Sequence, residues 1–119
     1  MLSSLNSASV YLACGSTDLR KSIDGLAALV THSFELDLFS NSLFVFCNRD
    51  RDKLKILFWD CNGFWLYYRR LERGRFKWPS SSSEQATLAI EMRQLQWLLD
   101  GLSLEQRKAH TRVTARITV

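Results

Sequence analysis

The sequence predicts a single α+β domain, a mostly antiparallel sheet built as a β-meander with two helices on one face. Three observations support this fold class. A chain of 119 residues with 46% hydrophobic content is long enough to bury one core. Residues 48–79 alternate apolar and polar side chains between turn signals, and a stretch on either side of them has apolar residues at helical spacing. We place the domain at residues 1–102 and expect 103–119 to be a basic, loosely ordered tail.

The N-terminal part is predicted to form one strand and one helix. Ser9–Cys14 has the composition of a strand and is ended by Gly15. A helix is expected over about Leu19–His32, with Thr17 or Asp18 as its cap. The residues at helical spacing that define its buried side are Leu19, Ile23, Leu26 and Val30.

A strand over Leu43–Cys47 leads into tight hairpins between residues 48 and 79. Asn62-Gly63 is the strongest short hairpin signal, because both central positions of a type I′ turn need a positive φ. If Arg73-Gly74 is a second two-residue loop, Glu72 faces Arg75 and Arg70 faces Lys77. The first turn sets the pairs Cys61 with Phe64, Leu57 with Tyr68, Lys55 with Arg70, and Lys53 with Glu72.

The two turns sort the meander onto two faces, because side chains along a strand alternate with period two. One face is apolar and is predicted to form the core: Leu54, Ile56, Phe58, Trp65, Tyr67, Leu71, Phe76 and Trp78. Arg69 is the one charged residue on that side. The other face is cationic with aromatic residues set into it: Lys53, Lys55, Leu57, Trp59, Leu66, Tyr68, Arg70, Glu72, Arg75 and Lys77.

After the loop that begins at Pro79, the chain is predicted to add one more strand and one more helix. Thr87–Ile90 has the pattern of a short edge strand. A helix is expected over about Glu91–Asp100, where Leu95, Leu98 and Leu99 are buried, and it ends at Gly101.

Basic charge is concentrated in the meander. The whole chain has a net charge of +4, whereas residues 49–78 contain nine basic and four acidic residues, which leaves −1 for the remainder. Localised positive charge with interleaved aromatics suggests a polyanionic partner, most commonly nucleic acid. The alternative is a sheet face that only keeps the protein soluble. The predicted nucleic-acid-binding residues are Arg49, Arg51, Lys53, Lys55, Tyr68, Arg70, Arg73, Arg75 and Lys77.

No pattern of catalytic or metal-binding residues occurs in the sequence. Cys14, Cys47 and Cys61 form no C-x-x-C pair and have no His at ligand spacing, so no metal is expected. His32 and His110 have no neighbouring nucleophile, and there is no phosphate-binding loop, dinucleotide fingerprint or nucleophile elbow. We therefore expect no cofactor and no enzymatic activity.

The sequence also predicts the compartment. Three cysteines are an odd number, which is typical of free thiols in a reducing environment. The first residues lack the pattern of a signal peptide, and no apolar run approaches the length of a membrane span. A cytoplasmic protein without a membrane partner is expected.

Charged residues cluster at the predicted start of the first helix. Arg20 and Asp24 are spaced for an i,i+4 ion pair, which is the structural interpretation of this cluster. The alternative is contact with a protein partner, for which the candidate residues are Asp18, Arg20 and Lys21.

Five segments together resemble a known family: Tyr11–Ala27, Leu43–Phe46, Asp52–Asp60, Arg70–Phe76 and Trp97–Gly101. In order and spacing, from Val10 to about Leu102, they resemble the small accessory protein called TnpB, or Orf2, of insertion sequences of the IS-sixty-six family. The resemblance implies a bacterial mobile-element protein encoded beside a separate, larger transposase that carries the acidic catalytic triad. It supplies no catalytic residues for this chain.

The resemblance departs from the family pattern at two points. Cys61 stands where the family's turn usually reads Gly before Asn62-Gly63, and Glu91-Met92 replaces a Thr-Pro type of helix start, which removes a good cap. Residues and resemblance together predict a non-catalytic accessory protein of transposition that binds DNA, at the element ends, through its basic-aromatic sheet face. The alternative is a module that docks on the element's transposase without contacting DNA.

Overall fold

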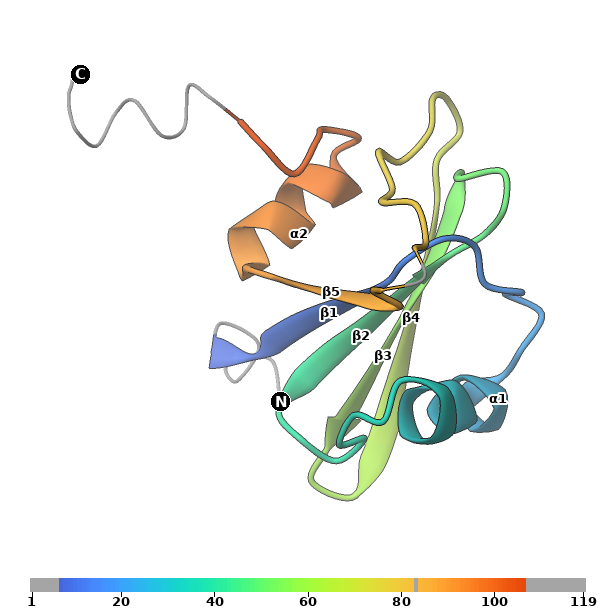
Figure 1. Ribbon diagram of the computed structural model, residues 1–119, viewed down its shortest axis with the longest axis vertical. Helices are drawn as coiled ribbons and strands as arrows, with labels where there is room; N and C mark the ends of the chain where they lie inside the picture. The colour runs from blue at the N-terminus through green and yellow to red at the C-terminus, as the bar shows by residue number, and fades with distance from the viewer. Residues whose placement is uncertain (1–6, 83, 107–119) are drawn as a thin grey trace, which may run out of the picture.

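The computed structural model describes residues 7–82 and 84–106. It contains a five-stranded sheet in the order β4-β3-β2-β1-β5, with two helices (Figure 1). This confirms the predicted α+β class and the mostly antiparallel sheet. The elements are β1 (Ser9–Ala13), α1 (Ile23–Ala28), which continues into the π-helical turn η2 (Leu29–Ser33), β2 (Ser42–Cys47), β3 (Lys53–Asp60), β4 (Gly63–Arg70), β5 (Thr87–Ile90) and α2 (Met92–Leu99).

One pair of strands in the sheet is parallel. β1 runs parallel to β2, and the connection between them contains α1, as a parallel pair requires. β2, β3 and β4 then form the predicted antiparallel meander. β5 comes from the far end of the chain and pairs antiparallel with the other side of β1.

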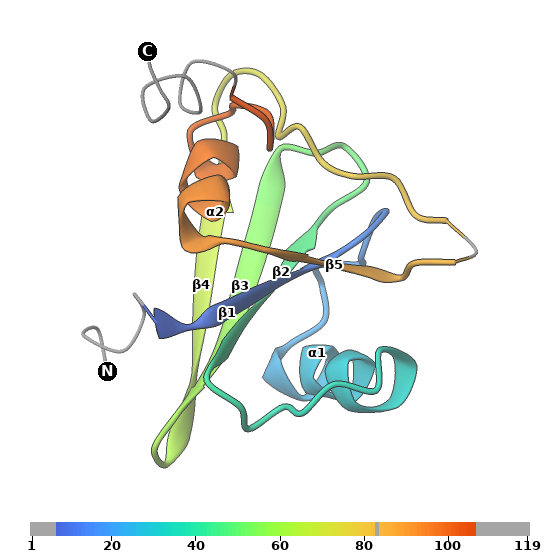
Figure 2. The same ribbon diagram turned by 60° about the vertical axis from the view of Figure 1, so that its left-hand side comes forward.

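The two helices lie on opposite faces of the sheet, so the prediction that both cover one face is wrong (Figures 1 and 2). Leu95 and Leu98 of α2 pack in one apolar cluster, whereas Leu26 of α1 and Val30 of η2 pack in a second. β2 separates the two clusters and is buried along its whole length. A continuous apolar run is the sequence signal of a strand that is covered on both sides.

The β3–β4 hairpin has a different turn from the predicted one. Asp60 faces Gly63, so the turn residues are Cys61 and Asn62, and Lys55 faces Tyr68 instead of Arg70. A shift of two residues leaves every side chain on its predicted face, since only an odd shift exchanges faces. The observed register pairs apolar neighbours across the strands, which outweighs the preference of Asn-Gly for the turn: Leu57 with Leu66, Phe58 with Trp65, and Trp59 with Phe64.

The predicted second hairpin is absent from the structure. Gly74 has a positive φ of 79°, as a turn there requires, but the residues after it cross the sheet instead of pairing with β4. Phe76 N–H donates to Arg51 O at 2.7 Å, and Trp78 Nε1 donates to Ala13 O at 2.8 Å. Phe76 and Trp78 are buried as predicted, but the cross-strand pairs Glu72 with Arg75 and Arg70 with Lys77 do not form.

Two residues on the α2 face differ from their predicted roles. Trp65 is 47% exposed and therefore lies outside the core. Arg69, the charged residue on the apolar side, donates from Nε to Leu99 O at 3.1 Å. Leu99 is the last residue of α2, where the orphan carbonyls and the helix dipole favour a cation.

The start of α2 is capped, contrary to the expectation from Glu91-Met92. Glu91 N–H donates to Gln94 Oε1 at 2.8 Å, which is one half of a capping box. The predicted edge strand at Thr87–Ile90 is confirmed. No helix among the described residues is long and apolar enough to cross a membrane. From residue 107 onward, the predicted tail lies outside the described residues.

Candidate nucleic-acid interface

A cleft of about 860 Å³ opens on the α1 face of the sheet, beside the start of β3 and the end of β4. Three parts of the chain form it: the loop after β1, the turn between β2 and β3, and the neighbouring parts of β3 and β4. We call it the basic cleft. Its lining residues are Ser16, Thr17, Asp18, Leu19, Arg20, Asn48, Arg49, Asp50, Lys53, Lys55 and Tyr68.

Strand alternation places the sheet residues of the basic cleft. Leu57 is fully buried in the cluster under α1, so Lys55 and Lys53, two and four residues earlier, face the same side. The register puts Tyr68 directly opposite Lys55. Tyr68 is 55% exposed, which leaves an aromatic surface beside the cations.

Lys55 fastens the loop after β1 to the sheet. Its ammonium group donates to Leu19 O at 2.6 Å and to Lys21 O at 3.3 Å. These bonds satisfy two carbonyls just ahead of the helix, and α1 begins only at Ile23. The predicted helix start at Leu19, capped by Thr17 or Asp18, is therefore wrong.

Asp18 holds Arg20 in a two-pronged ion pair instead of capping the helix. Arg20 Nη2 lies 2.8 Å from Asp18 Oδ2, and Arg20 Nε lies 3.0 Å from Asp18 Oδ1. The hydrogen bond from the Arg20 side chain lowers the pKa of the Asp18 carboxyl to about 2. The predicted pair between Arg20 and Asp24 does not form.

The turn between β2 and β3 is organised by one amide side chain. Asn48 Oδ1 accepts hydrogen bonds from the backbone N–H groups of Asp52 and Lys53, at 3.1 and 3.0 Å. Asn48 Nδ2 donates to Asp52 Oδ1 at 2.7 Å, and this bond lowers the pKa of the Asp52 carboxyl. The turn presents Arg49 at the mouth of the cleft, where its side chain is exposed.

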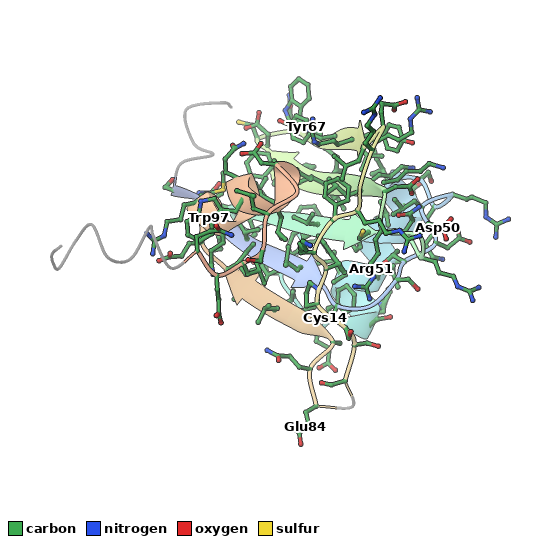
Figure 3. The ribbon with its side chains drawn as sticks, turned by 90° about the horizontal axis from the view of Figure 1, so that it is seen from above. Cys14, Asp50, Arg51, Tyr67, Glu84 and Trp97 are labelled. Atoms are coloured by element: carbon green, nitrogen blue, oxygen red, sulfur yellow. The ribbon has the colours of Figure 1, made fainter. Side chains whose placement is uncertain are left out.

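The other predicted nucleic-acid-binding residues lie away from the cleft lining. Arg51 has a φ of 63° and donates from Nη1 to Trp78 O at 2.9 Å, so it anchors the segment that crosses the sheet. Figure 3 shows Asp50 at the margin of the molecule and Arg51 further in. Arg70 faces Lys53 across the strands and pairs with Glu72 at 2.7 Å. The exposed basic residues of the crossing segment are Arg73, Arg75 and Lys77.

The balance of charge in the cleft favours an anion. Arg20 and Asp18 neutralise each other, which leaves Arg49, Lys53 and Lys55 against the single carboxylate of Asp50. Within residues 7–82 and 84–106, neither Arg49 nor Lys53 has an ion pair. Guanidinium and ammonium groups of this kind bind phosphate oxygens. Over the same residues, no group of three or more His, Cys, Asp or Glu side chains is placed to hold a metal ion.

Alternation along β3 and β4 was enough to find Lys53, Lys55 and Tyr68 as neighbours. The second wall of the cleft was missed, and with it Ser16, Thr17 and the turn-forming Asn48. Asn48 carries a local signal, because Asn favours turns through such side-chain bonds. The loop wall carries none, since its place depends on the parallel pairing of β1 with β2. The candidate partner residues Asp18 and Arg20 thus join the cleft, and Lys21 reaches it through its carbonyl.

Comparison with known proteins places the chain in a family. A family model described as IS66 Orf2 like protein matches residues 8–109. An uncharacterised protein of Sinorhizobium fredii, y4hO, is 39% identical over 102 residues, which cover 86% of this chain and 87% of that protein. A second from the same organism, y4jC, is 33% identical over 70 residues, 59% of this chain and 60% of that protein. No solved structure matches. The chain belongs to the IS66 Orf2-like family of transposition-associated proteins.

Proposed function

We propose that the protein binds the phosphate backbone of DNA in the basic cleft and assists transposition without performing the strand chemistry itself. The observation that carries the proposal is that the cleft combines an exposed aromatic ring with cations that have no ion pair among the described residues. Phosphates pair with the cations, and an unpaired base stacks on the ring. Membership of a transposition-associated family supports DNA as the polyanion.

Two residues are the strongest candidates for phosphate contacts. Arg49 and Lys53 line the cleft, and the described part of the structure gives their side chains no ion pair. Lys55 already donates to two carbonyls, and Arg20 is paired with Asp18. The main role of Lys55 and Arg20 is therefore to hold the shape of the cleft. Tyr68 offers its exposed ring for stacking on any base.

A salt titration with matched variants tests the cleft. Each neutralised phosphate contributes roughly −0.9 to the slope of log K against log salt on duplex DNA. Replacing both cleft cations, Arg49→Gln with Lys53→Gln, is expected to flatten the slope by about two such contributions. The control, Arg73→Gln with Arg75→Gln, removes the same charge outside the cleft and is expected to keep the wild-type slope. Fluorescence anisotropy on duplex DNA measures both.

Equal slopes for the two double variants, or no binding by the wild type at low salt, would contradict DNA binding in the basic cleft. The second candidate function, docking on the transposase, would then replace it. Exposed aromatic surface near the hairpin turn favours that candidate: Phe39 is 60% and Trp65 is 47% exposed. A pull-down with the transposase, with and without terminal DNA, separates the two, because docking alone requires no DNA.

A further inference from the structure

β4 forms one edge of the sheet along its whole length. All eight of its residues, Gly63–Arg70, pair with β3, and no strand lies on its other side in the described structure. Figure 3 shows the strand that carries Tyr67 at the margin of the molecule. The two helices pack in the apolar clusters on the two faces of the sheet.

The outward backbone groups of β4 can be assigned from the ladder. Leu71 N–H donates to Asp52 O, the next pair in the β3–β4 register, so the odd-numbered residues of β4 direct their N–H groups toward β3. The even-numbered residues therefore direct N–H and C=O away from the sheet. Over the described residues, no hydrogen bond reaches the backbone of these four: Phe64, Leu66, Tyr68 and Arg70.

Nothing in the sequence of the central stretch Phe64–Tyr68 protects this edge. Soluble proteins blunt exposed edges with short strands, lysines, prolines or inward charges. β5, at the opposite edge, has only four residues, Thr87–Ile90. β4 instead presents five consecutive apolar or aromatic side chains, Phe64–Tyr68, with charge only at its last two positions, Arg69 and Arg70. Such an edge is a template for another strand.

The geometry points to a second copy of this chain as the partner, paired with β4 antiparallel about a two-fold axis through Leu66. A two-fold contact presents the same surface on both subunits, so the strand has to complement itself. Pairing centred on Leu66 places aromatic against aromatic on both faces, with Trp65 opposite the second copy's Tyr67 and Phe64 opposite its Tyr68. Such cross-strand pairs stabilise antiparallel sheets.

Charge selects this register over one nearer the end of the strand. With Leu66 at the centre, Arg70 lies opposite Asn62 of the second copy, and Arg69 lies opposite Gly63. Centring on Arg70 would place two arginines directly opposite each other, which destabilises the pair. The chosen register also brings Trp65, which is 47% exposed, into contact with a neighbouring strand.

The dimer would form one continuous sheet of both copies with the two basic clefts on the same face. A two-fold axis perpendicular to a sheet keeps each face on its own side, so Lys53 and Lys55 of both copies point the same way. The pairing rests on the strand edge alone and does not depend on the proposed DNA binding.

Sedimentation equilibrium of the full chain without DNA tests the pairing. The wild type is expected to have the mass of two 13.8 kDa chains, and Trp65→Lys is expected to shift toward one. Leu102→Lys is the matched control, because Leu102 is 43% exposed but lies off the sheet, and it is expected to remain a dimer. A monomeric wild type, or equal effects of the two variants, overturns the proposal.

A cysteine scan tests the register and does not depend on the Trp65 variant folding. In a Cys61→Asn background, Leu66→Cys is expected to give a reducible covalent dimer, because facing hydrogen-bonded residues lie about 5.5 Å apart between Cα atoms. Tyr68→Cys is expected to give none, since its two copies would be offset by about 13 Å along the strands. Crosslinking at position 68 instead of 66, or at neither, contradicts the pairing about Leu66.

Discussion

Cys61 holds a backbone conformation that its side chain disfavours. It has a φ of 60° in the two-residue turn between β3 and β4, and Asn62 N–H donates to Asp60 O across it. A residue with a Cβ costs roughly 1–2 kcal/mol in this region, whereas Gly adopts it readily. The departure from the family pattern, Cys where Gly is usual, therefore falls on the position with positive φ.

Cys61→Gly is expected to stabilise the protein by about 1 kcal/mol, because relief of this strain exceeds the added flexibility of the unfolded chain. Urea unfolding measures it as a higher midpoint at unchanged m. Asn62→Gly is the control. Asn62 is not among the positive-φ residues, so its replacement by Gly relieves no backbone strain. It only adds the same flexibility to the unfolded chain, and no stabilisation is expected. A lower midpoint for Cys61→Gly would contradict the strain.

Individual elements show which parts of the fold the sequence predicts. Period-two alternation located β3 and β4 and sorted Lys53, Lys55 and Tyr68 correctly, because a register error of two residues preserves the faces. The start of α1 was missed, since Leu19 fits the helical spacing while its carbonyl is bound by Lys55, 36 residues away. Contacts of that range leave no local signal.

Placement of the helices shows a second kind of limit. A strand was predicted over Leu43–Cys47 and both helices were placed on one face of the sheet, although the continuous apolar run fits a strand buried on both sides. That interpretation would have predicted α1 and α2 on opposite faces of the sheet. It would also have restricted the basic face to the start of β3, before Leu57, where the cleft opens.

α2 depends on a cation supplied by the sheet. Arg69→Gln removes the positive charge and the bond to Leu99 O at the C-terminus of the helix, and is expected to destabilise the protein by about 0.5–1 kcal/mol. The measurement is urea unfolding at low ionic strength. Arg73→Gln is the control, because Arg73 is exposed and the described structure shows no bond from its side chain. Equal losses for the two variants would show that Arg69 contributes only its net charge.

At the scale of the molecule, Cys47 reports on opening of the core. It is fully buried in β2, and burial raises the pKa of its thiol to about 11, whereas Cys61 is exposed. At pH 8, a thiol reagent is expected to label Cys61 rapidly and Cys47 only at the rate of global unfolding. Mass spectrometry of labelled peptides, with and without urea, measures both sites. Rapid labelling of Cys47 without urea would mean that the sheet opens locally.

The insertion of β1 between β2 and β5 has a consequence for synthesis of the protein on the ribosome. β1 is translated first, but its antiparallel neighbour, Thr87–Ile90, emerges after every other strand. Until then, Ser9–Ala13 is an open strand edge in the nascent chain, whatever β2, β3 and β4 have already formed. A reading frame that stopped between β4 and β5 would leave that edge permanently bare and prone to aggregation. Completion of the sheet therefore awaits the synthesis of β5.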